Sequence, residues 1–149
     1  MTRVDKIFNT ISLIAQNSNL HFRHGAIITK GSSKPLYTGY NTSRSKFYNY
    51  TSHSLHSEID VALKLFLQLK RKNKSKKNIK RILNKYIVWI GRVSRTNTIL
   101  DSKPCIICKK RLIQMGFNNI GYSDSNNNIV ITKLKNIDNC VYTSSDYNI

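Results

Sequence analysis

Two short stretches constrain this 149-residue chain more than any other feature: His56-Ser57-Glu58 and Pro104-Cys105-Ile106-Ile107-Cys108. Two cysteines three residues apart, directly after a proline, suit the first turn of a helix, where both sulfurs point to one side. A histidine from elsewhere in the chain would complete three ligands for a tetrahedral zinc ion and leave one position open, as in catalytic zinc sites. The pattern therefore predicts a zinc site of His56, Cys105 and Cys108, with Glu58 as a neighbouring carboxylate that is not a ligand.

Each stretch also has a simpler interpretation when it is taken alone. An isolated histidine is more often a surface or helix-capping residue, and a cysteine pair can be a redox dithiol or half of a structural zinc knot. A knot needs a fourth ligand, for which only Cys140 or His53 is available, and neither has the spacing of a knot. The redox interpretation leaves the His-Ser-Glu stretch unexplained. The two stretches together therefore favour the zinc site.

The same stretches resemble the zinc-binding signature of the cytidine and deoxycytidylate deaminase superfamily. Segments 23–30, 35–41 and 86–134 also resemble strands and a helix of that family, in the same order. The resemblance implies a zinc-dependent hydrolytic deaminase that converts a cytosine-type base to uracil and releases ammonia. In such an enzyme Glu58 would transfer the protons.

The resemblance leaves the substrate open. Family members that act on nucleotides favour a free (deoxy)cytidine nucleoside or nucleotide, while adenine and guanine also stay open because the sequence does not give the shape of the pocket. A deaminase of single-stranded DNA or RNA and a non-catalytic zinc module that binds nucleic acid are the alternatives. Because Glu58 is the only glutamate in the chain and stands at the acid/base position, it argues against the non-catalytic module.

Three further residues are candidates for contact with the substrate. By resemblance, Asn41 is expected to bind the sugar or base, although an asparagine at this place could simply form a turn. Tyr48 and Tyr50 could stack on a base at the mouth of the pocket, or could be packing residues. Family members commonly self-associate, so a homo-oligomer is also expected.

The predicted fold is a three-layer α/β/α domain over residues 1–136, followed by a tail at 137–149. A mixed five-stranded sheet should lie between helices, and the last strand should be antiparallel because the turn at 124–128 is followed by no helical segment. The expected helices are 3–16, from about 56 to 69, and 105–115, and the expected strands are 25–28, 36–40, 83–93, 119–123 and 129–134.

The charge is strongly positive, with 25 Lys and Arg against seven acids and a formal net charge of +18. An AT-rich genome would explain abundant lysine but not scarce glutamate, whose codons are similarly A-rich. A polyanionic partner such as single-stranded nucleic acid is therefore predicted, against the alternative of a harmless basic surface. An insert at 70–81 is the candidate contact region, and a solvated flexible loop or a nuclear-localisation-like patch are alternatives for it. The candidate nucleic-acid-binding residues are Lys70, Arg71, Lys72, Lys74, Lys76 and Lys77.

The sequence also indicates an intracellular protein. No apolar run approaches the ~18 residues of a membrane span, and the first residues have the pattern of a helix and not of a signal peptide. Two of the three cysteines belong to the motif, and Cys140 is left over. This odd number argues against a disulfide scaffold and for a reducing compartment, either cytoplasmic or nuclear.

Overall fold

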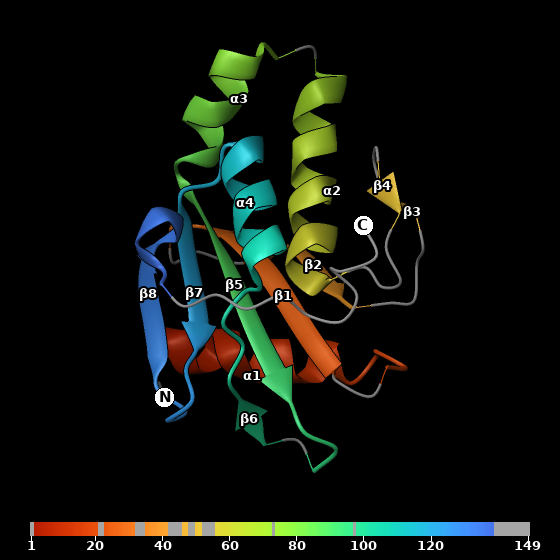
Figure 1. Cartoon of the computed structure of the whole chain (residues 1–149), viewed down its shortest axis with the longest axis vertical. Coiled ribbons are helices and arrows are strands. Elements are labelled where there is room, and N and C mark those ends of the chain that lie inside the picture. The colour runs from red at the N-terminus through yellow and green to blue at the C-terminus, as the bar shows by residue number, and fades with distance from the viewer. Residues whose placement is uncertain are drawn as a thin grey trace.

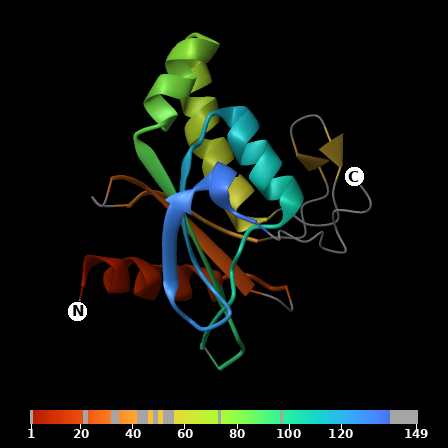
Figure 2. The same cartoon turned by 60° about the vertical axis from the view of Figure 1, so that its left-hand side comes forward.

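A six-stranded sheet lies between helices on both of its faces (Figure 1). The computed structural model describes residues 2–20, 23–31, 35–41, 46–47, 50–51, 56–72, 74–96 and 98–138. Helix α1 (Arg3–Ala15) crosses the strands on one face, and α2 (Ser57–Arg71), α3 (Lys76–Leu83) and α4 (Ile106–Met115) cover the other. Figure 2 shows the same layers from a second direction. The predicted three-layer α/β/α architecture is confirmed.

The strand order in the sheet is β2-β1-β5-β7-β8, and only β5 and β7 are parallel neighbours. The last strand is antiparallel, as predicted. A sixth strand, β6, pairs with β5 and was not predicted, because two residues are too few to show a periodic pattern. The strands of this sheet are β1 (Arg23–Lys30), β2 (Pro35–Tyr40), β5 (Tyr86–Val93), β6 (Ile99–Leu100), β7 (Asn119–Ser123) and β8 (Ile129–Lys133).

Two short elements were also not predicted. Strands β3 (Lys46–Phe47) and β4 (Tyr50–Thr51) pair with each other in a segment for which no strand was predicted. A 3-10 helix, η1 (Leu134–Asn136), follows β8 and buries Leu134. None of the helices in the described part of the chain is both long and apolar enough to span a membrane.

Helix α1 begins with a capping box. The Thr2 hydroxyl accepts from the Asp5 backbone N–H, and the Asp5 carboxylate accepts from that of Thr2, both at 3.1 Å. These bonds satisfy two of the donors that a helix start leaves open. The buried face of α1 then packs Phe8 edge-on against Trp89, with ring centroids 6.4 Å apart. The Trp89 indole N–H donates to Thr29 Oγ1 at 2.8 Å, so the ring is fixed from both ends.

Two glycines let α1 approach the sheet closely. Gly25 of β1 and Gly91 of β5 lie opposite each other in the sheet, directly under Ile11. A Cβ on Gly25 would lie 2.6 Å from the Ile11 carbonyl oxygen, and one on Gly91 would lie 2.5 Å from Ile11 Cγ2. Neither separation is compatible with the present position of the helix.

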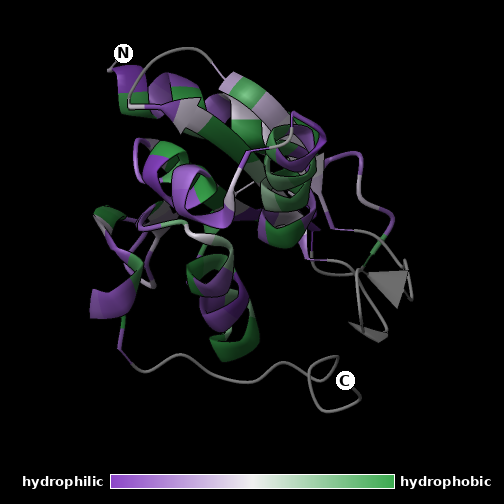
Figure 3. Ribbon diagram, turned by 90° about the horizontal axis from the view of Figure 1, so that it is seen from above, coloured by the Kyte–Doolittle hydropathy of each residue, from purple (hydrophilic) through white to green (hydrophobic). Residues whose placement is uncertain are grey.

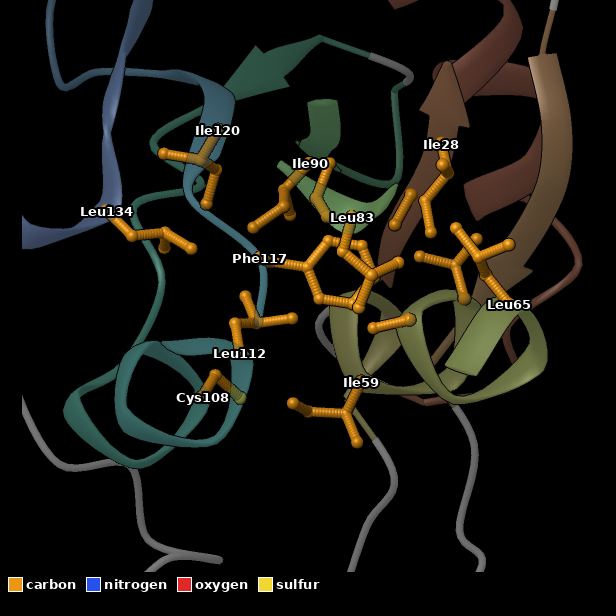
Figure 4. Packing of buried hydrophobic residues seen from close by; sticks show 14 of the residues in the cluster. Ile28, Ile59, Leu65, Leu83, Ile90, Cys108, Leu112, Phe117, Ile120 and Leu134 are labelled. Atoms are coloured by element: carbon orange, nitrogen blue, oxygen red, sulfur yellow. The ribbon is translucent and has the colours of Figure 1, made fainter. Parts of the chain in front are cut away.

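The larger core lies on the other face of the sheet. There the helix ribbons alternate between hydrophobic and hydrophilic residues (Figure 3). Their buried apolar residues belong to one core cluster with those of the strands. Figure 4 shows Ile59 and Leu65 of α2 and Cys108 and Leu112 of α4 beside strand residues such as Ile90. The first turns of both helices are therefore part of the core.

The lysine-rich insert at 70–81 is largely helical, which corrects the alternative interpretation of this segment as a flexible loop. In α3, Ile79 and Leu83 are four residues apart and both buried, and Ser75 caps the helix by accepting from Asn78 N–H at 3.2 Å. Leu83 therefore ends this helix and does not begin a strand, so β5 starts three residues later than predicted.

The end of α4 helps to position α3. Gly116 ends α4 in the left-handed conformation, with a φ of 117°, which glycine adopts without strain. A Cβ there would lie 3.0 Å from Lys80 Cα, so α3 packs directly on the end of α4.

Replacing Gly25 with alanine should destabilise the fold by about 1–3 kcal/mol, because the added methyl group forces α1 away from the sheet. Urea unfolding followed by circular dichroism measures this change. Leu13→Ala is the control, since Leu13 lies on the solvent side of α1 with 67% of its surface exposed. That variant should stay within about 0.5 kcal/mol of the wild type. Equal losses in both variants would contradict the close packing of α1 on Gly25.

Candidate metal centre

The candidate site lies where α2 and α4 begin. His56 is the N-cap residue of α2 and Cys105 is that of α4, so the predicted helix starts are confirmed. The His56 ring makes no capping hydrogen bond. Cys105 does cap its helix, since its sulfur accepts from the Cys108 backbone N–H at 3.4 Å. Pro104 consequently precedes the cap and lies outside the helix. The sequence had suggested that it lies in the first turn.

The three predicted ligands come together. His56 Nδ1 lies 3.0 Å from Cys108 Sγ and 3.6 Å from Cys105 Sγ. The three ligand atoms all lie within 4.8 Å of one another, and neither cysteine is in a disulfide. Bonds of about 2.0–2.3 Å to a tetrahedral zinc ion require its ligand atoms to be about 3.6 Å apart. The donor set and its spacing therefore fit zinc, and two sulfurs with one imidazole suit this metal chemically.

The two thiols differ in acidity. Hydrogen bonds with Cys108 and, to a smaller extent, with His56 lower the pKa of Cys105 to about 7 against the effect of burial. Burial raises the pKa of Cys108 well above its usual value. Cys105 is thus the more acidic of the two thiols. A cation that binds both sulfurs has to displace the Cys108 proton, which is how metal binding couples to proton release.

Glu58 lies in the first turn of α2, two residues after His56, and is only 4% exposed. Its carboxylate is near both sulfurs, since it raises the pKa of Cys105 and of Cys108. The Ser57 hydroxyl, fully buried, donates to Glu58 Oε2 at 3.4 Å. Ser57 was not predicted as a functional residue, because its only signal in the sequence is that it is a small polar residue between two functional ones.

A buried pair of serines anchors the segment that leads into Cys105. The Ser102 hydroxyl donates to the Ile90 carbonyl oxygen at 2.8 Å. Its Oγ also lies 2.7 Å from Ser123 Oγ. The Ser123 N–H donates back to Ser102 Oγ at 2.9 Å. Strands β5 and β7 thereby hold the chain two residues before Pro104. Nothing in the sequence pointed to Ser123 as the partner.

Of the three predicted substrate contacts, the structure describes the side chain of Asn41 alone. It is buried at the end of β2, where its Oδ1 accepts from the His24 backbone N–H at 2.9 Å and its carbonyl accepts from Ser18 Oγ. The first bond orients the side-chain amide of Asn41, and the second holds its backbone. Tyr48 and the side chain of Tyr50 lie outside the described residues, as do His53 and Cys140.

The predicted nucleic-acid-binding residues lie away from the metal ligands. All six are exposed, and they follow α2 from its last turn into the start of α3. At about 1.5 Å per residue, Lys70 lies about 18 Å along the helix from Glu58. The structure therefore separates these cations from the candidate metal centre.

No protein-family model matches the sequence, and no curated protein does so either. Solved structures do match. A cytidine deaminase from Burkholderia pseudomallei superimposes with a TM-score of 0.59 at 10% identity, over 94% of this chain and 99% of that one. The chain has the cytidine deaminase fold.

Two other solved structures share this fold. A cytidine deaminase from Mycobacterium tuberculosis has a TM-score of 0.53 at 14% identity, over 96% of this chain and 99% of that one. A dCMP deaminase from the cyanophage S-TIM5 has a TM-score of 0.50 at 19% identity, over 81% and 82%. The resemblance inferred from the two motifs thus extends to nearly the whole chain.

We expect the wild-type protein to bind a single zinc ion and Cys108→Ser to lose it, because serine replaces a soft sulfur with a poor zinc ligand. Inductively coupled plasma mass spectrometry of the purified proteins measures zinc per chain. Glu58→Gln is the matched control, since Glu58 is near the sulfurs but outside the ligand set, and it should keep its zinc. Loss of zinc in that variant would contradict the assignment of Glu58.

Ser102→Ala should lower the free energy of unfolding by about 1–3 kcal/mol, since it leaves the buried Ser123 N–H without its acceptor. Urea unfolding measures the change. Ser125→Ala, in the exposed turn between β7 and β8, is the control and should have little effect. Unchanged stability of the Ser102 variant would show that the serine pair does not anchor this segment.

Proposed function

We propose that this protein is a zinc-dependent deaminase that converts a cytosine-type base to uracil, with a free (deoxy)cytidine nucleoside or nucleotide as its substrate. The single observation that carries the proposal is the buried Glu58 carboxylate beside His56, Cys105 and Cys108 at the start of two helices. The cytidine deaminase fold supports it, and so do the names of the similar structures, which are cytidine and dCMP deaminases.

His56, Cys105 and Cys108 would hold the zinc ion. When bound, zinc supplies a Lewis acid that brings the pKa of a water near 7 and so provides a nucleophile at neutral pH. The N-termini of α2 and α4 both meet here, and the positive ends of the helix dipoles favour the thiolates.

Glu58 would perform the proton transfers. Its carboxylate accepts a proton from the attacking water and delivers it to the ring nitrogen, which makes C4 more electrophilic. Glu58 then takes the second proton of that water from the new hydroxyl group on C4 and passes it to the amine. The C4–N bond breaks, ammonia leaves, and the oxygen remains on the ring as a carbonyl. The Ser57 hydroxyl supports this role because its bond to Oε2 restricts the carboxylate.

The remaining candidate residues belong to the same proposal. Asn41 would contact the sugar or base, and the bond from the His24 backbone N–H to its Oδ1 would orient its amide for that contact. Tyr48 and Tyr50 would stack on the base at the mouth of the site. A non-catalytic module would gain nothing from a buried carboxylate beside two sulfurs, which supports the catalytic assignment over that alternative.

Glu58→Gln should reduce ammonia release by about 10²–10⁴-fold, the usual contribution of a positioned general acid/base. A coupled ammonia assay measures this on cytidine, deoxycytidine, their monophosphates and single-stranded oligonucleotides. Asp60→Asn is the matched control, because it makes the same chemical change in the same turn of α2, at a carboxylate that pairs with Lys64 at 3.1 Å. It should retain activity.

The panel also tests the substrate class. Turnover of a nucleoside or nucleotide with inert oligonucleotides agrees with the proposal. Turnover of oligonucleotides alone would replace the proposed substrate by single-stranded nucleic acid. Zinc-loaded protein that releases no ammonia from any substrate would contradict the enzyme assignment.

A further inference from the structure

One end of the molecule carries a dense group of cations that the proposed reaction does not use. Helix α3 and the C-terminal ends of α2 and α4 gather there, at the opposite end of α2 and α4 from the candidate metal centre (Figures 1 and 2). We call this surface the basic end. Its members are all exposed, and they are Lys70, Arg71, Lys72, Lys74, Lys76, Lys77, Lys80 and Arg81.

Acidic residues are missing from this part of the sequence. None occurs between Val61 and Leu100, a span that includes the whole basic end, and the two acids of α2 lie in its first turn at the far end of the helix. A surface that carries only positive charges attracts polyanions over a long range. The composition of these elements is therefore complementary to a chain of phosphates.

Helix α3 holds its cations at fixed positions, although this arrangement is electrostatically unfavourable. Lys76 and Lys80, and likewise Lys77 and Arg81, are like-charge pairs four residues apart, which destabilise a helix. Lys76 and Lys77 also lie in the first turn, where the helix dipole disfavours cations. The buried Ile79 and the contact with Gly116 keep the helix in place. A bound polyanion would relieve the repulsion.

A pocket of about 370 Å³ opens between α2, α3 and α4 at the basic end. Its apolar lining includes Phe66, Ile79 and Met115, and its charged lining is Lys70, Lys76 and Arg111. No acidic residue lines it among those that the structure describes, and Lys70 Nζ lies 5.3 Å from the centre of the Phe66 ring. The volume falls within the usual range for small-ligand sites, about 300–1,000 Å³.

We propose that the basic end binds single-stranded nucleic acid, with an unpaired base in the pocket against Phe66 and the neighbouring phosphates at the cations of α3. An aromatic wall inside a basic groove is how proteins bind single strands without sequence preference. A duplex keeps its bases stacked and paired, so it can supply phosphates but no base for the pocket. This binding is separate from deamination and needs no reaction at the metal centre.

Fluorescence anisotropy with a labelled single strand of about 20 nucleotides tests the proposal. The test variant K76E/K77E reverses two charges in the first turn of α3, where the dipole favours carboxylates, so it should fold. The control R3E/K6E makes the same net-charge change on exposed positions of the first turns of α1, on the opposite face of the sheet. Its affinity should stay within about twofold of the wild type, since it lies outside the phosphate path.

The logarithm of the binding constant should fall linearly with the logarithm of the salt concentration between about 50 and 200 mM. The slope should be near −0.7 for each neutralised phosphate. K76E/K77E should lower the affinity about tenfold or more and make the slope shallower by about 1.4. An equal loss in R3E/K6E would overturn the proposal, because net charge alone would then explain binding. Absence of binding at the lowest salt would overturn it as well.

Phe66→Leu tests the base in the pocket, because leucine keeps an apolar wall and removes the flat ring. It should weaken single-strand binding about tenfold, as expected for loss of one stacked base. Competition by inorganic polyphosphate, which has no bases, should be unchanged in this variant. Unchanged single-strand affinity of the variant, or equal affinity of the wild type for a duplex of the same sequence, would overturn the single-strand assignment.

Discussion

Burial of apolar side chains from α2 and α4 against one face of the sheet determines where both helices begin. Ile59 follows Glu58 directly and is 1% exposed, and Cys108 is itself a core residue at 2%. Because these first turns are packed, the N-cap residues His56 and Cys105 have little freedom to separate. The geometry of the candidate metal centre is therefore a product of the hydrophobic core.

This arrangement also links the metal to stability. Sulfurs that lie in the core are removed from water, and the burial that suits a thiol penalises a thiolate. A bound cation satisfies both sulfurs at once, so part of its binding free energy acts as folding free energy. The serine pair at Ser102 and Ser123 also ties the site to the fold. Its hydrogen bonds to β5 and β7 hold the segment that leads into Cys105, so that the position of this segment depends on the strands and not on the loop itself.

The sequence predicted those features that depend on residue type and short spacing. The ligand set and Glu58 are identified by their chemistry, and α1 by the helical pattern of its residues. Helix α3 was not predicted, because eight cations dominate the insert at 70–81 while only Ile79 and Leu83 carry the periodic signal of a helix. Ser57 and Ser123 could not be assigned, since their roles arise from hydrogen bonds to groups that only the tertiary structure brings near.

The close packing of α1 on Gly25 and Gly91 has a consequence for how this protein can change during evolution. A Cβ at Gly91 would meet the Ile11 side chain, whereas a Cβ at Gly25 would meet the backbone of α1. A relative with alanine at position 91 should therefore carry a smaller residue than isoleucine at position 11. Substitutions at positions 11 and 91, which are far apart along the chain, are expected to covary, whereas position 25 should stay glycine.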